Sequence, residues 1–423
     1  MDKFVIHGGK SLQGRVTVSG AKNASLALMP ATLLAPGRYM LHNTPKLRDV
    51  TTMTRLLETM GLTLSHRDHT MVIDSSHVTG HEAPYEHVKK MRASIYVLGP
   101  LLARHGEAKV SLPGGCAWGP RPVNLHIEGL KRLGAEIELE EGYILAKAKR
   151  LKGAKVFFDV SSVGATGNVM MAAVLAQGTT LIENAAIEPE ITALAQFLVS
   201  MGAKINGIGT NKLEIEGVEE LHAADVTTIP DRIEAGTFLI AAAMNGSRGS
   251  TIRIEQCNPN HLNGLLARLE EAGAVISTGN DFIDVTASER IKSVNVTTAI
   301  YPGFPTDMQA QWMALMAIAN GTSVITETVY FDRFTHVPEL ARLGANITVK
   351  ENVATIVGVK KLKGAKVMST DLRASASLIL AGLAAEGTTE VLRVYHIDRG
   401  YETIEKKLQS LGADISRVSG EEF

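Results

Sequence analysis

One sequence unit recurs six times along this chain of 423 residues, and the repeat limits the possible folds more than any other feature. Each unit reads as an apolar helix, a glycine, a β-rich run, a loop, a second helix and a second glycine followed by a strand. Corresponding glycines lie about 70 residues apart, the length of a βαβαββ unit. The first helices of the six units are expected at Asn23–Leu34, Arg92–Arg104, Gly167–Gln177, Ile233–Asn245, Asp307–Asn320 and Leu372–Glu386.

Two series of glycines punctuate the repeat in one register. Glycine is the residue that a left-handed helix C-cap favours. The first helices stop at Gly37, Gly106, Gly178, Gly246, Gly321 and Gly387. The second helices stop at Gly61, Gly134, Gly202, Gly273, Gly344 and Gly412. The residues after the second series alternate as a strand does, as in Ala135–Leu139, so two matched series of six indicate true repetition.

The pattern of apolar residues predicts how the repeats pack. The first helices are apolar nearly all round, as in Ala235–Ala243, and such helices are normally buried, whereas the second helices carry charges on one face. Three repeats around three buried helices would form one globule with sheets outside, and six repeats would form two. We expect the N-terminal strand to pack with the C-terminal half. The predicted domains are residues 22–230, and residues 1–21 together with 231–423.

Composition narrows the class of protein. The chain is 45% hydrophobic and 21% charged with a formal net charge of −1, which favours a globular protein over a nucleic-acid or membrane-surface binder. No signal peptide and no apolar run of about 20 residues is recognisable. Cys116 and Cys257 have neither metal-ligand nor disulfide spacing. We therefore expect a cytoplasmic protein without a metal, a cofactor or an obligate protein partner.

Charged residues collect where the buried helices begin. Lys22, Arg92 and Arg373 lie near predicted helix N-termini, where a cation opposes the helix macrodipole. If these N-termini face one cleft, their free N–H groups and the cations form an anion-binding site. Asp307 begins the fifth helix, where a carboxylate is also an ordinary N-cap.

A glycine- and proline-rich segment, Leu112–Pro122, replaces the loop of the second repeat and contains Cys116 and Arg121. A free cysteine is usually a buried structural residue. Here a nearby arginine would stabilise a thiolate, so we interpret the segment as a mobile lid that carries a reactive thiol. Cys257 follows a strand-like run and is interpreted as structural.

Several motifs together resemble the UDP-N-acetylglucosamine 1-carboxyvinyltransferase family over the whole chain. The motifs are Ser19–Ala24, Met91–Ser94, Pro113–Ala117 with Arg121–His126, Ser162–Thr166, Tyr301–Gln309, Thr326–Val329 and Asp398–Glu402. The resemblance implies the enolpyruvyl-transferase fold, an inside-out α/β barrel of two domains, each built from three βαβαββ units. It also implies an active site in the cleft between the domains.

The resemblance further implies the reaction and its residues. The family transfers enolpyruvate from phosphoenolpyruvate to the 3′-hydroxyl of UDP-N-acetylglucosamine and releases phosphate, as the first committed step of peptidoglycan synthesis. It implies catalytic roles for Cys116, Asp307, Lys22 and Arg399. Phosphoenolpyruvate would be bound by Lys22, Asn23, Arg121, Arg373 and Arg399. The nucleotide sugar would be bound by Asn23, Arg92, Arg121, Pro122, Val123, Asn124, Leu125, Ser162, Val163, Gly164, Asp307 and Val329.

Cys116 would donate the proton to C3 of the enol and would be the target of the epoxide antibiotic fosfomycin. Two departures from the family pattern, Asn124 for Asp and Val160 for Lys, bear on nucleotide binding. One alternative function is 5-enolpyruvylshikimate-3-phosphate synthase, which lacks the cysteine lid. The other is a catalytically idle paralogue that only binds a nucleotide sugar.

Overall fold

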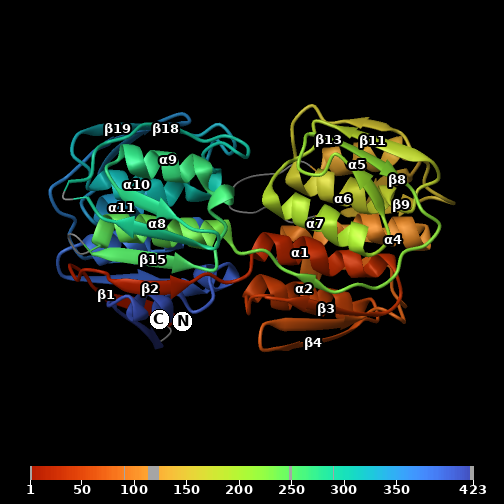
Figure 1. Cartoon of the computed structure of the whole chain (residues 1–423), viewed down its shortest axis with the longest axis horizontal. Helices are drawn as coiled ribbons and strands as arrows, with labels where there is room; N and C mark the ends of the chain where they lie inside the picture. The colour runs from red at the N-terminus through yellow and green to blue at the C-terminus, as the bar shows by residue number, and fades with distance from the viewer. Residues whose placement is uncertain (1, 90, 113–122, 247–249, 289, 420–423) are drawn as a thin grey trace. The chain divides into compact units, whose positions relative to one another are not determined.

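The computed structural model describes residues 2–89, 91–112, 123–246, 250–288 and 290–419. The chain divides into two compact units: unit 1 comprises Met1–Ser19 and Pro230–Phe423, and unit 2 comprises Gly20–Ile229 (Figure 1). The chain therefore leaves unit 1 after Ser19 and returns to it at Pro230. The sequence analysis placed these crossings after residues 21 and 230.

Unit 2 contains three four-stranded sheets in the part of the chain that the structure describes, and all share one pattern. The first strand pairs parallel with the second, the second antiparallel with the third, and the third antiparallel with the fourth. In that order the strands are β14 (Val226–Thr227), β3 (Arg38–His42), β5 (Thr70–Asp74) and β4 (Thr63–Arg67); β6 (Glu82–Ala83), β7 (Glu107–Ser111), β9 (Tyr143–Lys147) and β8 (Glu136–Glu140); and β10 (Lys155–Phe157), β11 (Thr179–Glu183), β13 (Lys212–Glu216) and β12 (Lys204–Asn206).

Unit 1 repeats this pattern in three further sheets of described residues. The strands are β2 (Gly14–Thr17), β15 (Thr251–Glu255), β17 (Phe282–Thr286) and β16 (Val275–Thr278); β18 (Val296–Thr297), β19 (Thr322–Thr326), β21 (Val353–Val357) and β20 (Asn346–Lys350); and β22 (Lys366–Met368), β23 (Thr388–Leu392), β1 (Asp2–His7) and β24 (Asp414–Ser419). Strand β1 lies between β23 and β24, and Figure 1 shows the red N-terminal strands among the green and blue elements of unit 1. The expectation that the N-terminal strand packs with the C-terminal half is confirmed.

Three helices form the inside of each unit. They are α1 (Lys22–Ala31), α4 (Leu98–His105) and α6 (Val163–Ala173) in unit 2, and α8 (Arg232–Asn245), α10 (Gln309–Ala317) and α12 (Leu372–Ala384) in unit 1. Every residue from Leu372 to Leu383 in α12 is buried, as the nearly all-round apolar pattern predicts. The surrounding strands alternate in burial, which turns one face of each sheet toward these helices.

The remaining helices complete the repeats. They are α2 (Arg48–Thr59), α3 (Tyr85–Val88), α5 (Asn124–Arg132), α7 (Pro189–Ser200), α9 (Asn263–Glu271), α11 (Val337–Arg342) and α13 (Ile404–Ser410). Short 3₁₀ helices are η1 (Thr32–Leu34), η2 (Arg92–Val97), η3 (Pro259–His261), η4 (Thr306–Met308) and η5 (Val394–Arg399). The second helix of each repeat was expected to carry charges on one face. Helix α7 is largely apolar instead, because its residues from Ile191 to Leu198 pack against α1 and α6.

Several helix boundaries differ from the sequence-based expectations: the helix expected at Arg92–Arg104 is divided into η2 and α4, and the one expected at Asp307–Asn320 into η4 and the shorter α10. Helix α6 begins at Val163 rather than near Gly167, because Ser162 caps it by accepting a hydrogen bond from the Ala165 amide at 3.3 Å. Gly246 has a φ of −62°, so it ends α8 in extended rather than left-handed backbone. All six glycines of the second series have positive φ, between 89° and 105°, as a left-handed helix stop requires. None of the described helices is both long and apolar enough to cross a membrane.

The position of β1 leads to a stability prediction. Phe4 on β1 is fully buried in the core of unit 1, so Phe4→Ala should cost about 3–5 kcal/mol of unfolding free energy through lost burial and a residual cavity. Val418→Ala on the neighbouring strand β24, where the side chain is 40% exposed, is the matched control. Denaturant titration followed by peptide-resolved hydrogen exchange should show faster exchange in β23 and β24 and unchanged exchange in unit 2. Equal losses in the two variants would contradict the buried role of β1.

Candidate active site

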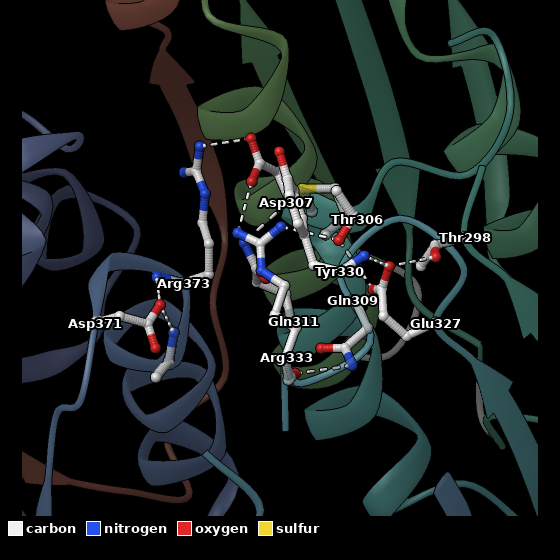
Figure 2. A network of polar contacts seen from close by, with 12 residues as sticks. Thr298, Thr306, Asp307, Gln309, Gln311, Glu327, Tyr330, Arg333, Asp371 and Arg373 are labelled. Atoms are coloured by element: carbon white, nitrogen blue, oxygen red, sulfur yellow. Dashed lines mark hydrogen bonds and ion pairs between the residues drawn. The ribbon is translucent and has the colours of Figure 1, made fainter. Parts of the chain in front are cut away.

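The strongest cluster of buried charges in unit 1 surrounds Asp307. One carboxylate oxygen accepts a hydrogen bond from the Arg333 Nη2 at 2.7 Å, and the other accepts one from the Arg373 Nη2 at 3.1 Å. The two arginine side chains are 7% and 8% exposed, and Asp307 is 28% exposed. Figure 2 shows the carboxylate of Asp307 between the two guanidinium groups. One accessible carboxylate therefore holds two nearly buried cations.

Electrostatics fixes the charge states of this cluster. Burial raises the pKa of Asp307, but the charges of Arg373 and Arg333 outweigh it and hold the pKa well below its ordinary value. Burial lowers the pKa of Arg373, but the charge of Asp307 outweighs burial and raises the pKa above its usual range. Two guanidinium groups and one carboxylate give the cluster a net positive charge.

The local sequence explains how these side chains meet. Asp307 lies in η4, which leads into the buried helix α10, and Arg373 is the second residue of α12, which packs against α10. Asp371 caps α12 by accepting hydrogen bonds from the amides of Arg373 and Ala374. The interpretation of Asp307 as an N-cap is wrong, because the residues that precede η4 and α10 are Pro305 and Met308 and neither helix has a side-chain cap.

Sequence reasoning missed Arg333. It lies in the loop between β19 and α11, six residues after Glu327, and its Nη1 also donates to the Thr306 hydroxyl at 2.9 Å. Its guanidinium lies 5.5 Å from the centre of the Tyr330 ring. A loop arginine between charged and aromatic neighbours resembles many surface residues, so no sequence signal separated it from them. Only the structure, in which the Arg333 side chain is nearly buried and pairs with Asp307, identifies this residue as part of the cluster.

Arg399 is the last residue of η5, which packs against α12. The next residue, Gly400, approaches the start of that helix so closely that an added Cβ would lie 2.6 Å from a methyl group of Leu372. Arg373 also contacts this segment, because its Nη1 donates to the Tyr401 hydroxyl at 3.5 Å. The structure thus brings the segment that carries Arg399 to the same helix end as Arg373.

In unit 2, the predicted residues also begin helices. Lys22 and Asn23 begin α1, and the Lys22 ammonium lies 3.6 Å from the buried carboxylate of Asp49 on α2. Arg92 begins η2, which packs against both α1 and α6. Val123 precedes α5, and Asn124 and Leu125 are its first residues. Ser162 caps α6, whose first residues are Val163 and Gly164.

A buried carboxamide ties three of these segments together. The Asn168 Oδ1 accepts from the Gly99 amide at 2.6 Å, and the Nδ2 donates to the Ile95 carbonyl at 2.8 Å and to the His126 Nδ1 at 3.1 Å. Burial and the positive charge of Arg92 lower the pKa of His126 to about 4, so the ring is neutral at pH 7. Because Nδ1 accepts, the proton resides on Nε2, which faces Gly164.

Three predicted residues, Cys116, Arg121 and Pro122, lie outside the residues that the structure describes. Val160, one of the two departures from the family pattern, is 64% exposed, and Asn124, the other, is exposed at the start of α5. Val329 follows β19, two residues after Glu327. In the described part of the chain, no group of three His, Cys, Asp or Glu residues is arranged to hold a metal ion.

The second cysteine, Cys257, lies among the residues that the structure describes and is free and buried. Cys257 is 2% exposed, and its thiol lies 3.4 Å from the Ile254 carbonyl. Burial, followed by the negative charge of Asp281, raises the pKa of Cys257 to about 11. At neutral pH this thiol is protonated and inaccessible, which agrees with the structural interpretation.

The geometry supports a definite kind of chemistry. Unit 1 supplies guanidinium groups around one ionised carboxylate, and unit 2 supplies helix N-termini with Lys22, Arg92 and a neutral histidine. Guanidinium groups suit bidentate recognition of carboxylates and phosphates, and helix N-termini suit anions. Each unit therefore contains groups that are suited to binding an anion, and Asp307 is a partly exposed carboxylate beside those of unit 1.

Comparison with known proteins identifies the family. Residues 6–408 match the family described as EPSP synthase (3-phosphoshikimate 1-carboxyvinyltransferase). Two relatives are each named UDP-N-acetylglucosamine 1-carboxyvinyltransferase. The protein from Chloroherpeton thalassium is 60% identical, covering 100% of this chain and 99% of its own, and the one from Geobacter metallireducens is 55% identical, covering 99% and 100%.

Solved structures share the fold. The enolpyruvyl transferase NikO from Streptomyces tendae matches with a TM-score of 0.89 and 27% identity over 99% of both chains. An EPSP synthase from Acinetobacter baumannii matches with a TM-score of 0.76 and 18% identity over 99% of this chain and 100% of its own, a likeness of fold alone. The expected enolpyruvyl-transferase fold is confirmed. On this sequence identity over its whole length, the chain belongs to the UDP-N-acetylglucosamine 1-carboxyvinyltransferase family of enolpyruvyl transferases.

Proposed function

We propose that this protein transfers the enolpyruvyl group of phosphoenolpyruvate to the 3′-hydroxyl of UDP-N-acetylglucosamine and releases phosphate. The observation that carries the proposal is the 60% identity over the whole chain to a protein named for this activity. The arginine-bound carboxylate of Asp307 supplies the matching chemistry. The shikimate alternative is not favoured, because its solved relatives share 18–19% identity.

Phosphoenolpyruvate carries a carboxylate and a phosphate, so its site needs several cations in a partly dehydrated environment. We assign Arg373 to the carboxylate, and Arg333 supports this assignment because it shares the partner Asp307. Lys22, Arg121 and Arg399 are assigned to the phosphate, and Asn23 is assigned to phosphoenolpyruvate as well. The two nearly buried guanidinium groups are oriented before substrate arrives, which reduces the entropy lost on binding.

Asp307 is assigned as the group that accepts the proton of the attacking hydroxyl. In the structure its low pKa makes it a weak base, because two guanidinium groups stabilise its negative charge. A bound anionic substrate gives those guanidinium groups a second partner and adds a negative charge nearby. Both effects raise the pKa of Asp307. The co-substrate would thereby strengthen the base at the moment when the base is needed.

The two steps of the reaction balance as follows. The sugar oxygen bonds to C2 of the enol while its proton passes to Asp307, and C3 gains a proton from Cys116. In the resulting intermediate the bond between C2 and the phosphate oxygen then breaks, while a C3 proton returns to the Cys116 thiolate formed in the first step. The proton held by Asp307 leaves with inorganic phosphate, so both groups return to their starting states. Cys116 is assigned as the proton donor to C3 on the family resemblance and because Arg121 follows it by five residues in the sequence.

We assign the nucleotide sugar to Asn23, Arg92, Asp307, Val329 and the starts of α5 and α6. The assigned residues there are Val123, Asn124 and Leu125 around the start of α5, and Ser162, Val163 and Gly164 at the start of α6, which Asn168 fixes to η2 and α5. Arg121 and Pro122, which precede them in the sequence, are assigned to the nucleotide sugar as well. We further propose that the reaction occurs in the cytoplasm and provides precursors for peptidoglycan, and hence for cell shape and division. The protein needs no metal or cofactor in this scheme.

A steady-state assay tests the proposed function directly. The purified protein should release inorganic phosphate from phosphoenolpyruvate only when UDP-N-acetylglucosamine is present. Replacing the nucleotide sugar with shikimate 3-phosphate should give no release. Phosphate release with neither acceptor, or with the shikimate acceptor alone, would overturn the proposal, and binding of the nucleotide sugar without turnover would favour an idle paralogue.

The thiol assignment predicts a selective covalent modification. Fosfomycin should add to Cys116, faster when UDP-N-acetylglucosamine is bound, because a thiolate opens an epoxide. Cys257 should stay unmodified because it is buried and its pKa is raised to about 11. Intact-mass measurement and peptide mapping should find one adduct, on Cys116, and none in Cys116→Ser. An adduct on Cys257, or no adduct at all, would contradict the assignment.

The role of Asp307 predicts a loss of turnover that exceeds any loss of binding. Asp307→Asn keeps the shape of the side chain but cannot accept the proton, so turnover should fall at least about 100-fold. The KM for UDP-N-acetylglucosamine should change much less. Asp284→Asn is the control, because Asp284 forms a bidentate pair with Arg253 at 2.7 and 2.8 Å outside the site. Unchanged turnover in Asp307→Asn would remove this residue from the mechanism.

The same variant should show a characteristic pH dependence of stability. The folded-state pKa of Asp307 is depressed, so its contribution to stability is present above the unfolded pKa of about 3.9 and is lost as pH falls further. Unfolding midpoints of the unaltered protein and Asp307→Asn should therefore differ by a constant amount from pH 8 to about pH 5 and converge below about pH 4. Convergence above pH 5 would show that the two arginines do not stabilise the carboxylate.

A further inference from the structure

A second buried carboxylate lies behind the Asp307 cluster. Glu327, which follows β19, is fully buried. Its Oε1 accepts hydrogen bonds from the Thr298 hydroxyl at 2.7 Å and from the amides of Val329 and Tyr330 at 2.8 and 2.9 Å. Its Oε2 accepts from the Thr306 hydroxyl at 2.9 Å. A buried carboxylate is costly unless its lone pairs are satisfied, so these four donors hold it in one orientation.

The two oxygens of Glu327 serve different segments. Oε1 closes the turn at Val329 and Tyr330, which a purely structural residue could do. Oε2 reaches instead to the residue that precedes Asp307. Figure 2 shows Glu327 and Thr306 on one side of Arg333, with Asp307 beyond it. The second contact has no part in closing the turn.

The Thr306 hydroxyl can donate only one hydrogen. Because that hydrogen is directed at Glu327, the oxygen must present its lone pairs elsewhere, and it accepts from the Arg333 Nη1 at 2.9 Å. The other end of the same guanidinium donates to Asp307 at 2.7 Å. The contacts form one chain from Glu327 through Thr306 and Arg333 to Asp307. Each member fixes the direction of the next bond.

We propose that Glu327 is a positioning residue that sets the orientation of Asp307 through the Thr306 hydroxyl and Arg333. This inference rests on the proposed function, in which Asp307 accepts the proton of the sugar hydroxyl. The same carboxylate holds the Val329 amide, in the segment assigned to the nucleotide sugar. Glu327 therefore couples the placement of the base to the placement of the substrate that it deprotonates.

Paired substitutions separate these two functions of Glu327. Thr306→Val keeps the shape and removes the hydroxyl, and Thr306→Ser restores it. Glu327→Gln retains an oxygen for Thr298, Val329 and Tyr330 but places an amide group, which can only donate, against Thr306. Glu327→Ala removes both sets of contacts. Thr389→Val is the control, because Thr389 is fully buried in unit 1 and its hydroxyl has no hydrogen-bond partner.

We expect Thr306→Val and Glu327→Gln each to lower kcat about tenfold or more, with the KM for UDP-N-acetylglucosamine within about threefold of the unaltered value. Thr306→Ser should recover most of the kcat. The double variant Thr306→Val with Glu327→Gln should be no worse than the poorer single variant, because both break one chain. Glu327→Ala should also raise that KM. Thr389→Val should leave kcat unchanged.

Thermal unfolding of every variant, measured beside the kinetics, identifies losses that arise from misfolding. Thr306 is only partly buried, so Thr306→Val should fold even if the Glu327 variants do not. The kinetics of Thr306→Val and Thr306→Ser then still test the proposal. A folded Thr306→Val with full kcat, a Thr306→Ser as poor as the valine variant, or additive losses in the double variant would each overturn the proposal. If the unaltered protein transfers enolpyruvate but any of these three contradicting results is found, the proposed function stands and the positioning role of Glu327 fails. An inactive unaltered protein overturns both.

Discussion

The burial of most of the length of three helices in each unit is the constraint on which the rest of the structure depends. A helix that contacts protein on every side cannot carry charges along its length, because an unpaired buried charge costs several kcal/mol. In α12 the residues from Leu372 to Leu383 are all buried, and the one cation among them, Arg373, is at the second position. Polar chemistry is therefore confined to the ends of these helices and to the loops that meet them. The first residues of α1, η2, α6 and α12, and η4 ahead of α10, carry most of the described groups of the proposed site.

An arginine near a helix N-terminus opposes the helix dipole, and the structure shows what offsets this cost. Asp371 caps the backbone of α12, and Asp307, which lies in η4, pairs with the side chain of Arg373. Arg373 is thus held in place by one carboxylate that serves the backbone and one that serves its side chain. Removing either would leave a buried cation with fewer partners, which explains why an aspartate lies at the centre of the site proposed to bind an anion. In the proposed mechanism, the same aspartate accepts a proton once an anionic substrate has become the second partner of its arginines.

The sequence predicted the repeat, the two groups of three buried helices and the N-terminal strand that joins the C-terminal half. These features depend on periodic patterns of apolar residues and glycines, which are local and strongly repeated. The start of α6 was misplaced because Ser162 and Val163 precede the apolar run, and only the hydrogen bond from Ala165 to Ser162 marks the true boundary. Asp307 and Arg373 were identified through motifs. Arg333, Thr306 and Asn168 acquire their roles from partners 20 to 80 residues away in the sequence, and no local pattern encodes such a meeting.

The contrast between Asp307 and Glu327 shows how one fold gives two carboxylates different tasks. Glu327 has no exposed surface and accepts only from hydroxyls and backbone amides in the contacts described above, none of which is an ionised group. Asp307 retains 28% exposure, and its two partners are guanidinium groups that an anionic substrate can also bind. A group whose partners a ligand can recruit will change its pKa when that ligand binds. Asp307 therefore suits proton transfer and Glu327 suits alignment, and the Thr306 hydroxyl is the link through which the rigid carboxylate orients the responsive one.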